Sequence, residues 1–350
     1  MKRLRTIFSL SLAVMLSATV GSCQFADPRE EYDNTPIGNF EALWNIMDTH
    51  YCFFDMKQRE LGVDWDSVHS KYRRLVKDGM SDLSLFEVLN NMLGELKDGH
   101  VNLYGRYDVG RNWTWKTDYP SNLSYDIRAD YLGKDYNIAA SGCFYRILPD
   151  NIGYIVIETF SNTIPDSKLD AIINWFAVCN GIIIDIRDNG GGKLTEAERV
   201  ASRFTEEKVI CGYIKYKNGP GRNDFSSPEP VYVKPAKERL RWHKPVAVLV
   251  NRGCFSSAND FAVKMKALPG AMLFGDRTGG GGGLPFSSEL PNGWSVRFSS
   301  APMFDADMNE IESGIEPDCY VCLTESDRAK GVDSLIEAAR KWINDMIINP

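Results

Sequence analysis

The chain has 350 residues, of which 43% are hydrophobic, 25% charged and 11% aromatic, a composition typical of a globular protein large enough for two domains. This composition excludes a disordered chain. Its 40 Lys and Arg residues against 47 Asp and Glu residues give a net charge of −7, and the only basic cluster is at the extreme N-terminus, so we expect no nucleic-acid partner. The single long apolar run, residues 6–20, is too short for a stable membrane-spanning helix, which excludes an integral membrane domain.

The N-terminus has the three parts of an export signal. A basic segment at residues 2–5 precedes an apolar run at residues 7–16, and small residues follow. The sequence Val20-Gly21-Ser22-Cys23 resembles the bacterial lipobox, in which the cysteine is acylated and becomes the first residue of the mature protein. We therefore expect residues 1–22 to be a lipoprotein signal peptide and Cys23 to carry the lipid. The alternative is that Cys23 merely follows an ordinary cleavage site.

A diacylated cysteine holds a protein at a bilayer surface without spanning the bilayer. We therefore expect an extracytoplasmic, lipid-anchored protein of a bacterial cell envelope, on its periplasmic or cell-surface face. Removal of residues 1–22 takes away three positive charges and changes the net charge from −7 to −10.

The cysteine pattern predicts no obligatory disulfides. Acylation of Cys23 leaves seven cysteines, an odd number without regular spacing. One C-x-x-C motif, residues 319–322, has no second pair, so we interpret it as a late strand with two small apolar thiols. We predict no metal and no cofactor.

The first part of the mature chain is a tether followed by helices. Residues 23–35 are polar and contain one proline, and a second proline follows at residue 36, as expected of a tether between lipid and fold. Apolar residues then recur at helical spacing in three segments, which predicts an N-terminal helical domain at residues 36–98. In the third segment Ser84 precedes Glu87 at capping-box spacing, which predicts that this helix starts at Ser84.

The rest of the chain changes character twice. Residues 99–150 are rich in Tyr, Asn, Trp and Gly, and we interpret them as a β-rich connection without a helix. From residue 151 to residue 350, short apolar strands alternate with amphipathic helices. This order predicts a layered α/β domain of catalytic size.

Three loops of this chain contain candidate functional residues. The first, residues 185–192, has the sequence Asp-Ile-Arg-Asp-Asn-Gly-Gly-Gly and follows an apolar strand directly. Its glycines allow backbone N–H groups to converge on an anion, although turn glycines after buried strands are also common. The loop has neither the dinucleotide nor the Walker spacing, so we do not expect it to bind nucleotide phosphates. Arg187 lies two residues from Asp185, and we interpret these two as a structural ion pair.

The second loop, residues 253–260, leads from a strand into a helix. A serine at a helix start can act as a nucleophile, because free N–H groups and the helix dipole stabilise developing negative charge. Ser257 and Asp260 also have the spacing of a helix cap, so a structural role for Ser257 is the alternative.

The third loop contains His100, directly after the helical domain. Histidine is the side chain best suited to act as a general base near neutral pH. The chain has only four histidines. The other three lie on amphipathic helices or in a polar stretch before a proline, whereas His100 lies at an element boundary, where functional residues collect.

Together with residues 274–280 and 313–318, these loops resemble the C-terminal-processing serine peptidases, the family that includes tail-specific and tricorn-type proteases. The resemblance spans nearly the whole mature chain. It implies an α/β fold in which the N-terminal helical bundle is followed by a crotonase-like, tail-specific-protease α/β catalytic domain. The substrate would be a peptide or a protein.

The resemblance favours the tricorn-type branch. The tail-specific branch uses a lysine base about 25 residues after the serine, but no lysine occurs from Ala267 to Glu289. The tricorn-type branch uses a histidine, and His100 matches its position. The glutamate of that branch corresponds to Glu312, with Glu310 as the competitor. Gly99 replaces the serine that precedes the histidine in the tricorn protease, which leaves the orientation of His100 open.

The implied mechanism is acyl transfer by a serine endopeptidase. Ser257 would attack a peptide carbonyl, and His100 would accept its proton and return it to the leaving amine. The backbone N–H groups of Gly191 and Ala258 would form the oxyanion hole, with Gly190 as the alternative to Gly191.

Many relatives carry a peptide-binding PDZ domain between their helical and catalytic parts. Residues 105–149 offer about half the length that such a domain needs, so we predict that it is absent. The alternatives to a peptidase are a catalytically degenerate protein that binds peptide, glycan or apolar ligands, and an esterase. The missing lysine, and Asp260 where a glutamate is commoner, favour the degenerate alternative.

Overall fold

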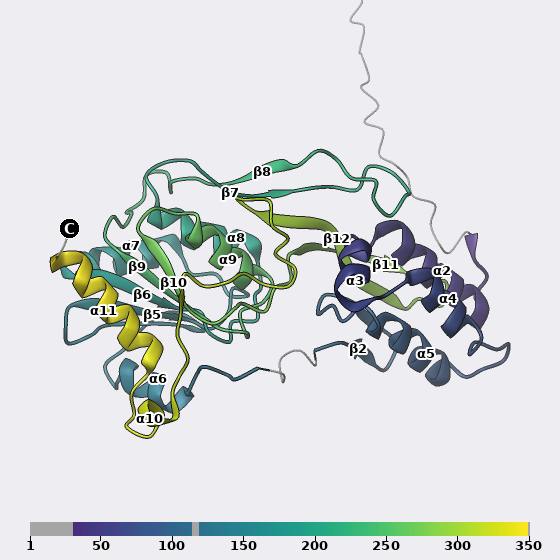
Figure 1. Cartoon of the computed structure of the whole chain (residues 1–350), viewed down its shortest axis with the longest axis horizontal. Helices are drawn as coiled ribbons and strands as arrows, with labels where there is room; N and C mark the ends of the chain where they lie inside the picture. Colours follow the sequence, from purple (N-terminus) through teal and green to yellow (C-terminus); the bar gives the residue numbers. More distant parts are fainter. Residues whose placement is uncertain (1–30, 114–118, 349–350) are drawn as a thin grey trace, which may run out of the picture.

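The computed structural model describes residues 31–113 and 119–348. The predicted signal peptide, Cys23 and all but the last residues of the predicted tether lie outside these ranges. Within them, no helix is both long and apolar enough to cross a membrane. The described chain forms two lobes, which long strands connect (Figure 1).

The N-terminal lobe is helical. Its helices are α2 (Pro36–His50), α3 (Phe54–Leu61), α4 (Trp65–Arg73) and α5 (Asp82–Gly94). The three predicted helices are present, and α3 is an additional one. The predicted start of α5 at Ser84 is wrong, because Ser81 is its N-cap and accepts a hydrogen bond from the Ser84 N–H at 3.2 Å.

The C-terminal lobe is built on a seven-stranded sheet with the order β13-β10-β9-β6-β5-β4-β3. Its strands are β3 (Asn137–Ala140), β4 (Cys143–Ile147), β5 (Ile152–Ile157), β6 (Gly181–Asp185), β9 (Val246–Val250), β10 (Ala271–Gly275) and β13 (Cys319–Tyr320). The five strands from β13 to β5 are parallel, while β4 and β3 continue the sheet as antiparallel strands.

Helices cover both faces of this sheet, as expected for parallel strands that are buried on both sides. Apolar residues of three helices share a core with one face: α7 (Asp166–Trp175), α8 (Leu194–Ala201) and α9 (Ser257–Lys266). On the other face α11 (Ser334–Ile348) packs with residues of β5, β6 and β9. The short helices η2 (Phe176–Val178), η3 (Ser202–Phe204) and α10 (Glu325–Arg328) complete the lobe. These layers confirm the predicted α/β fold.

A second sheet connects the lobes. Its strands are β1 (Asn102–Tyr104), β2 (Val109–Arg111), β7 (Val209–Ile214), β8 (Glu229–Val233), β11 (Gly283–Glu289) and β12 (Ser295–Asp305). The long strand β12 pairs with β1 through its first half and with β7 through its last residues. It therefore belongs to both lobes.

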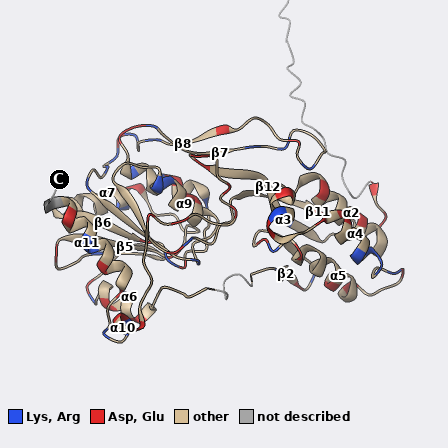
Figure 2. Cartoon of the chain, in the orientation of Figure 1, with Lys and Arg blue, Asp and Glu red and all other residues tan. Residues whose placement is uncertain are grey.

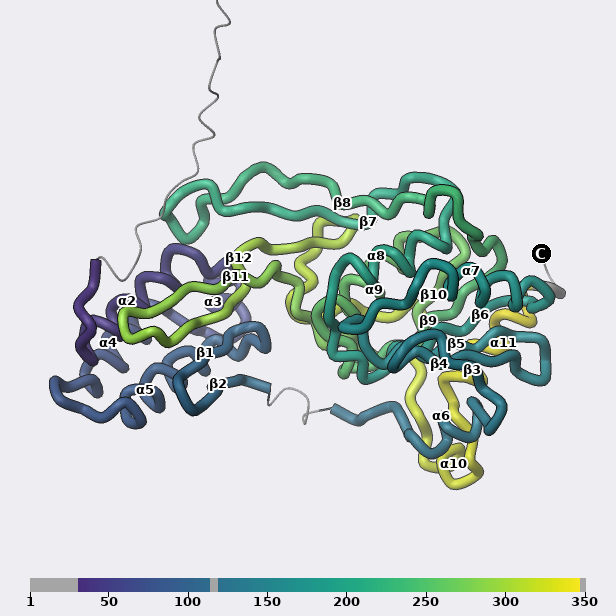
Figure 3. Tube along the Cα trace, turned by 180° about the vertical axis from the view of Figure 1, so that it is seen from behind, coloured from purple at the N-terminus to yellow at the C-terminus, as the bar shows by residue number. Residues whose placement is uncertain are grey.

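The β11–β12 hairpin packs on the N-terminal helices. Leu290, Trp294, Val296 and Phe298 lie in the apolar core of the helical lobe, and the view from behind shows the hairpin against α2 and α3 (Figure 3). The sequence predicts these residues only as part of the catalytic domain at residues 151–350. The short alternating pattern of the hairpin did not reveal that its apolar face is covered by helices 200 residues away in the chain.

One prediction for the connecting segment is wrong. Residues 99–150 contain a helix, α6 (Tyr125–Leu132), where none was expected. The helix is only eight residues long, and most of its apolar residues alternate along the chain instead of recurring at helical spacing, so its helical periodicity is weak. Contacts with the sheet domain hold it, including an ion pair between Arg128 and Glu158 at 2.6 Å.

Candidate active site

Ser256 lies at the end of the loop between β9 and α9, in an unusual backbone conformation. Its φ of 57° and ψ of −122° are sparsely populated for a residue other than glycine. Ser256 is the N-cap residue of α9, yet its side chain makes no capping hydrogen bond. Its hydroxyl is therefore directed away from the helix and available for another partner.

That partner is His100, which directly follows the helical lobe. The His100 Nε2 atom lies 3.0 Å from the Ser256 Oγ atom, which joins side chains 156 positions apart in the chain. The imidazole ring also packs against Phe255, with ring centroids 4.8 Å apart. A serine hydroxyl within hydrogen-bond distance of an imidazole is the arrangement of an activated nucleophile and its general base.

The position of His100 is fixed from several sides. Its backbone N–H donates to Asp98 at 2.7 Å, and Asp98 in turn accepts a hydrogen bond from the Tyr51 hydroxyl at 2.9 Å. The second ring nitrogen, Nδ1, lies 3.5 Å from the hydroxyl of Ser299 on β12. Ser299 is fully buried. The orientation that Gly99 left open in the sequence is thus set by groups on other elements.

The environment of His100 favours its neutral form. Burial lowers the pKa of the imidazole below its ordinary value of 6.5, and the positive charge of Arg297 lowers it further, while Asp98 acts in the opposite direction. An imidazole with a lowered pKa is unprotonated at neutral pH. Its Nε2 atom can then accept a proton from Ser256.

The predicted contact between His100 and Ser257 is not formed, and Ser256 takes its place. Ser257 is the first residue of α9, so its side chain points into the protein, where it is fully buried. Its hydroxyl is a buried polar atom without a hydrogen-bond partner among the described residues.

The sequence contained one signal that could have separated these neighbours. The residue just before a helix has a non-helical backbone, which can expose its side chain. The first residue inside the helix does not have this conformation. If the sequence had predicted that α9 starts at Ser257, Ser256 would have been identified as the residue before the helix. Helix boundaries are uncertain by one or two residues, which is enough to exchange two adjacent serines.

The N–H groups of the two residues first predicted for the oxyanion hole already have acceptors. The Gly191 N–H donates to the Asn189 side chain at 2.9 Å, and the Ala258 N–H donates to the Phe255 carbonyl at 3.1 Å. Both groups are therefore engaged. A Cβ atom on Gly190, the alternative to Gly191, would have no heavy atom within 4 Å, so the backbone of Gly190 lies in open space.

Gly191 nevertheless lies directly beside the serine loop. A Cβ atom on this residue would come within 2.9 Å of the Ser256 Cβ atom and 3.0 Å of the Ser257 nitrogen, and its φ is +99°. Gly192 follows it and lines the same cavity as Ser256. The Ser257 N–H lies in the first turn of α9, where backbone donors have no acceptor within the helix. Ser257 and Gly192 thus have backbone N–H groups next to Ser256 or to its cavity, and no backbone acceptor is found for either in the described chain.

Glu312 is buried next to the site but has no direct contact with His100. Its carboxylate accepts a hydrogen bond from the Gly282 N–H at 2.8 Å and lies 3.8 Å from the Lys57 amine. Burial raises the pKa of Glu312 well above its ordinary value, and the nearby Asp98 charge raises it further. The competitor Glu310 lies apart from the site and pairs with Arg59 at 2.5 Å.

Glu312 instead holds the glycine loop at residues 279–283. Besides the Gly282 contact, its carbonyl accepts from the Gly281 N–H at 2.9 Å. This loop in turn holds the loop that ends at Ser256, because the Ser256 N–H donates to the Gly280 carbonyl at 2.8 Å. Glu312 therefore supports Ser256 through two layers of backbone hydrogen bonds.

The predicted ion pair of Arg187 and Asp185 is confirmed. Their closest approach is 2.6 Å, both side chains are fully buried, and Asp333 pairs with the same guanidinium at 2.8 Å. Tyr154 adds a hydrogen bond to Asp185 at 2.9 Å. This network fixes the end of β6, from which the glycines beside Ser256 continue.

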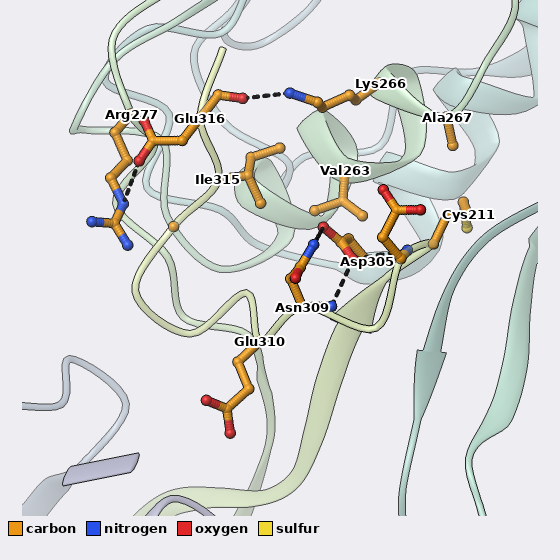
Figure 4. Close-up of a pocket in the computed structure, with 13 residues that line it drawn as sticks. Cys211, Val263, Lys266, Ala267, Arg277, Asp305, Asn309, Glu310, Ile315 and Glu316 are labelled. Atoms are coloured by element: carbon orange, nitrogen blue, oxygen red, sulfur yellow. Dashed lines mark hydrogen bonds and ion pairs between the residues drawn. The ribbon is translucent and has the colours of Figure 1, made fainter. Parts of the chain in front are cut away.

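Several cavities lie near these elements, including one beside Asp188 and Gly253 whose lining contains neither Ser256 nor His100. The one that contains Ser256 has a volume of about 200 Å³. A larger one of about 570 Å³ lies between α9 and the end of β12, and its lining contains neither Ser256 nor His100 (Figure 4). Its charged groups contact one another: Lys266 donates to the Glu316 carbonyl at 2.8 Å, and Arg277 pairs with the Glu316 carboxylate at 3.5 Å. The smaller cavity is therefore the candidate substrate site.

Charge does not gather on one side of the described chain. Basic and acidic positions are interspersed along the ribbon of both lobes (Figure 2). The expectation that the protein has no nucleic-acid partner rests on composition and stays a prediction.

Comparisons with known proteins agree with this arrangement. The model of peptidase family S41 matches residues 151–321, and that of the tricorn protease C1 domain matches residues 32–94. The carboxy-terminal processing protease CtpA of Bacillus subtilis is 32% identical over 198 residues, which cover 56% of this chain and 39% of CtpA. The chain spans only about a third of the length of such curated relatives.

Solved structures extend the similarity to almost the whole described chain. A candidate peptidase from Parabacteroides merdae is 49% identical, with a TM-score of 0.83 over 89% of this chain and 97% of that one. Mature CPAF, at 14% identity and a TM-score of 0.66 over 88% of this chain and 96% of its own, shares the fold. The chain therefore belongs to peptidase family S41, the family of the C-terminal processing serine peptidases.

Proposed function

We propose that this protein is a serine endopeptidase in which Ser256 is the nucleophile and His100 the general base. The observation that carries this proposal is the 3.0 Å contact between the Ser256 hydroxyl and the His100 imidazole. The strained backbone of Ser256, the lowered pKa of His100 and the membership in family S41 support it.

The reaction proceeds by acyl transfer. The Ser256 oxygen attacks the carbonyl carbon of a peptide bond while His100 accepts the hydroxyl proton at Nε2. The tetrahedral intermediate collapses when His100 returns this proton to the leaving amine, which leaves an acyl-enzyme on Ser256. A water molecule, deprotonated by the same imidazole, then hydrolyses the ester and regenerates the serine.

Backbone donors stabilise the oxyanion of the intermediate. In this proposal they are the N–H groups of Ser257 and Gly192, since those of Gly191 and Ala258 already have acceptors. The N-terminus of the buried helix α9 adds its dipole at the same point. One such donor contributes about 3 to 4 kcal/mol to transition-state stabilisation.

Two further groups position the base. Ser299 accepts or donates at the Nδ1 atom of His100, and Asp98 holds the backbone of the same residue. Glu312 acts on the nucleophile side, through the glycine loop. We propose it as a positioning residue rather than as a direct partner of the imidazole.

The lipid anchor is also part of this proposal. The sequence Val20-Gly21-Ser22-Cys23 supports acylation of Cys23, and an anchored peptidase would act on peptides or proteins outside the cytoplasm.

Hydrolysis of an unstructured protein tests the function. The full-length protein in mild detergent is incubated with β-casein, and the fragments are identified by mass spectrometry. We expect cleavage by the parent and by Ser257→Ala, and a decrease of at least about 1,000-fold for Ser256→Ala and His100→Ala.

A folded parent that leaves casein and short peptides intact would contradict the proposal. If such a protein still binds peptides after Ser256→Ala and His100→Ala, the degenerate binding protein is favoured instead. Cleavage of p-nitrophenyl esters without cleavage of peptides would favour an esterase.

A further inference from the structure

Arg297 lies in the wall of the cavity that contains Ser256. It is half-buried and occupies the middle of β12. Side chains alternate along a strand, so Arg297 points away from the helical core that contains Val296 and Phe298. It shares its face of the strand with Ser299, whose hydroxyl lies beside the His100 ring. The guanidinium is thus on the active-site side of the sheet.

Arg297 lacks a carboxylate partner within residues 31–113 and 119–348. Other arginines that are buried or half-buried, such as Arg187, Arg203 and Arg222, each pair with a carboxylate at 2.9 Å or less. Arg297 forms no such ion pair in the described chain, although its positive charge is close enough to lower the pKa of His100. A partly dehydrated guanidinium without a counter-ion is a ready binding group for an anion.

The other charge in the cavity is already balanced. Asp260 lines the same cavity, but it forms an ion pair with Lys264, one turn further along α9, and both side chains are almost fully buried. The remaining lining is glycine, apolar side chains and small polar groups, including Leu194, Leu284, Pro285, Met303 and Ile311. The unbalanced charge of the cavity therefore comes from Arg297.

The size of the cavity limits what it can hold. Its volume of about 200 Å³ is below the ~300 to 1,000 Å³ of pockets for drug-sized ligands. It accommodates one amino-acid side chain or the end of a peptide.

We propose that Arg297 determines specificity by binding a carboxylate of the substrate close to the scissile bond. The carboxylate belongs either to an acidic side chain or to the C-terminus of the substrate. This inference rests on the proposed peptidase function and adds the substrate class. A planar guanidinium binds a carboxylate through two parallel hydrogen bonds, which fixes both the position and the orientation of the bound peptide.

Cleavage of a proteome-derived peptide library tests this assignment. The full-length parent is incubated with the library, and cleavage sites are mapped by mass spectrometry. For the best site found, four peptides are then compared: with Glu or with Gln at the preferred position, each with a free or an amidated C-terminus. Preference for Glu in both end forms identifies a side-chain carboxylate, and preference for the free end identifies the terminal carboxylate.

The variants separate charge from geometry. We expect Arg297→Gln to lower kcat/KM for the preferred carboxylate peptide about 10- to 100-fold, the effect of losing a hydrogen-bonded charge, while the neutral peptide is affected less than about 3-fold. Arg297→Lys should recover part of the preference, and Arg297→Glu should shift it toward basic groups. The matched control is Arg106→Gln, an exposed arginine of the β1–β2 turn outside the cavity, which should keep the parent preference.

Failure of the inference differs from failure of the proposed function. A parent that cleaves carboxylate and neutral peptides equally, or an Arg297→Gln variant that keeps the preference, overturns the role of Arg297 but leaves the peptidase intact. Binding of the same fluorescein-labelled peptides to Ser256→Ala supplies a readout without hydrolysis. Tighter binding of the carboxylate form that is lost in Ser256→Ala/Arg297→Gln supports the inference even if the parent hydrolyses nothing, and equal binding of both forms overturns it.

Discussion

The residue scale is dominated by the contact between Ser256 and His100. Sequence reasoning identified His100 correctly as the histidine that faces the serine loop, because it is the one that lies at an element boundary. The serine that it predicted to face His100 was Ser257, whereas the adjacent Ser256 makes the contact. Only the exact first residue of α9 distinguishes the two. The residue beside the second ring nitrogen, Ser299, was not found at all. It lies on a strand about 200 positions away, and no local pattern marks it.

The lowered pKa of His100 predicts the acidic limb of the pH profile. The base must be neutral, and an imidazole with a lowered pKa stays neutral until the pH falls below its ordinary value of 6.5. We therefore expect kcat/KM to decrease only below pH 6.5. The positive charge of Arg297 contributes to the lowered pKa, so the limb should move to higher pH in Arg297→Gln. Initial rates across pH 4 to 8 measure this, and a limb above pH 6.5 in the parent would contradict the environment described for His100.

Removal of the Ser299 hydroxyl tests its positioning role. In Ser299→Ala the His100 ring loses its partner at Nδ1, so we expect kcat to decrease about 5- to 10-fold, the effect of one net hydrogen bond, with little change in KM. The matched control is Ser300→Ala on the same strand, whose hydroxyl lies 3.4 Å from the Leu284 carbonyl and has no contact with His100. Equal kcat values for the parent and Ser299→Ala would exclude the role.

At the scale of elements, the site depends on where the strands β6 and β9 end and where the helix α9 begins. The alternation of apolar strands and helices predicted these elements well, because parallel strands that are buried on both faces give long apolar runs. Two helices were not predicted: α3 in the N-terminal lobe and α6 in the connecting segment. Both are only eight residues long. Short helices are held by tertiary contacts, which sequence periodicity does not report.

The buried ion network at the end of β6 is open to a stability test. Asp333 pairs with Arg187 at 2.8 Å and also accepts hydrogen bonds from the first N–H groups of α11. Asp333→Ala leaves a buried positive charge only half compensated, so we expect the free energy of unfolding to decrease by about 3 to 5 kcal/mol. Urea unfolding followed by circular dichroism measures the change.

The control for this variant lies on the same helix. Asp345 pairs with Lys341 on the exposed side of α11, so Asp345→Ala should cost only about 0.5 kcal/mol. Similar losses for both variants would contradict the contribution of the buried network to stability.

At the scale of the whole molecule, the active site is assembled between two lobes. His100 follows the helical lobe, Ser256 belongs to the sheet lobe, and β12 belongs to both. A second connection is the segment between β7 and β8, where Arg222 pairs with Asp48 and Asp66 of the helical lobe at 2.6 Å each. The sequence predicted the two lobes as separate units. It could not predict the shared strand, because pairing partners far apart in the chain leave no local signal.

The proposed lipid anchor determines where the whole molecule acts. Cys23→Ala should abolish incorporation of an alkyne-labelled fatty acid and release the protein from the membrane fraction. Cys322→Ala, which alters an exposed thiol of the folded chain, should remain labelled and membrane-bound. A parent that incorporates no label and fractionates as a free protein would contradict the anchor.

The central claim is that Ser256, and not Ser257, carries the reactive hydroxyl. The most direct measurement is the reaction of the full-length protein with a fluorophosphonate, followed by peptide mapping of the adduct. We predict an adduct on Ser256 that is absent in Ser256→Ala, strongly reduced in His100→Ala and retained in Ser257→Ala. An adduct on Ser257, or a folded protein that the reagent does not modify, would contradict the account.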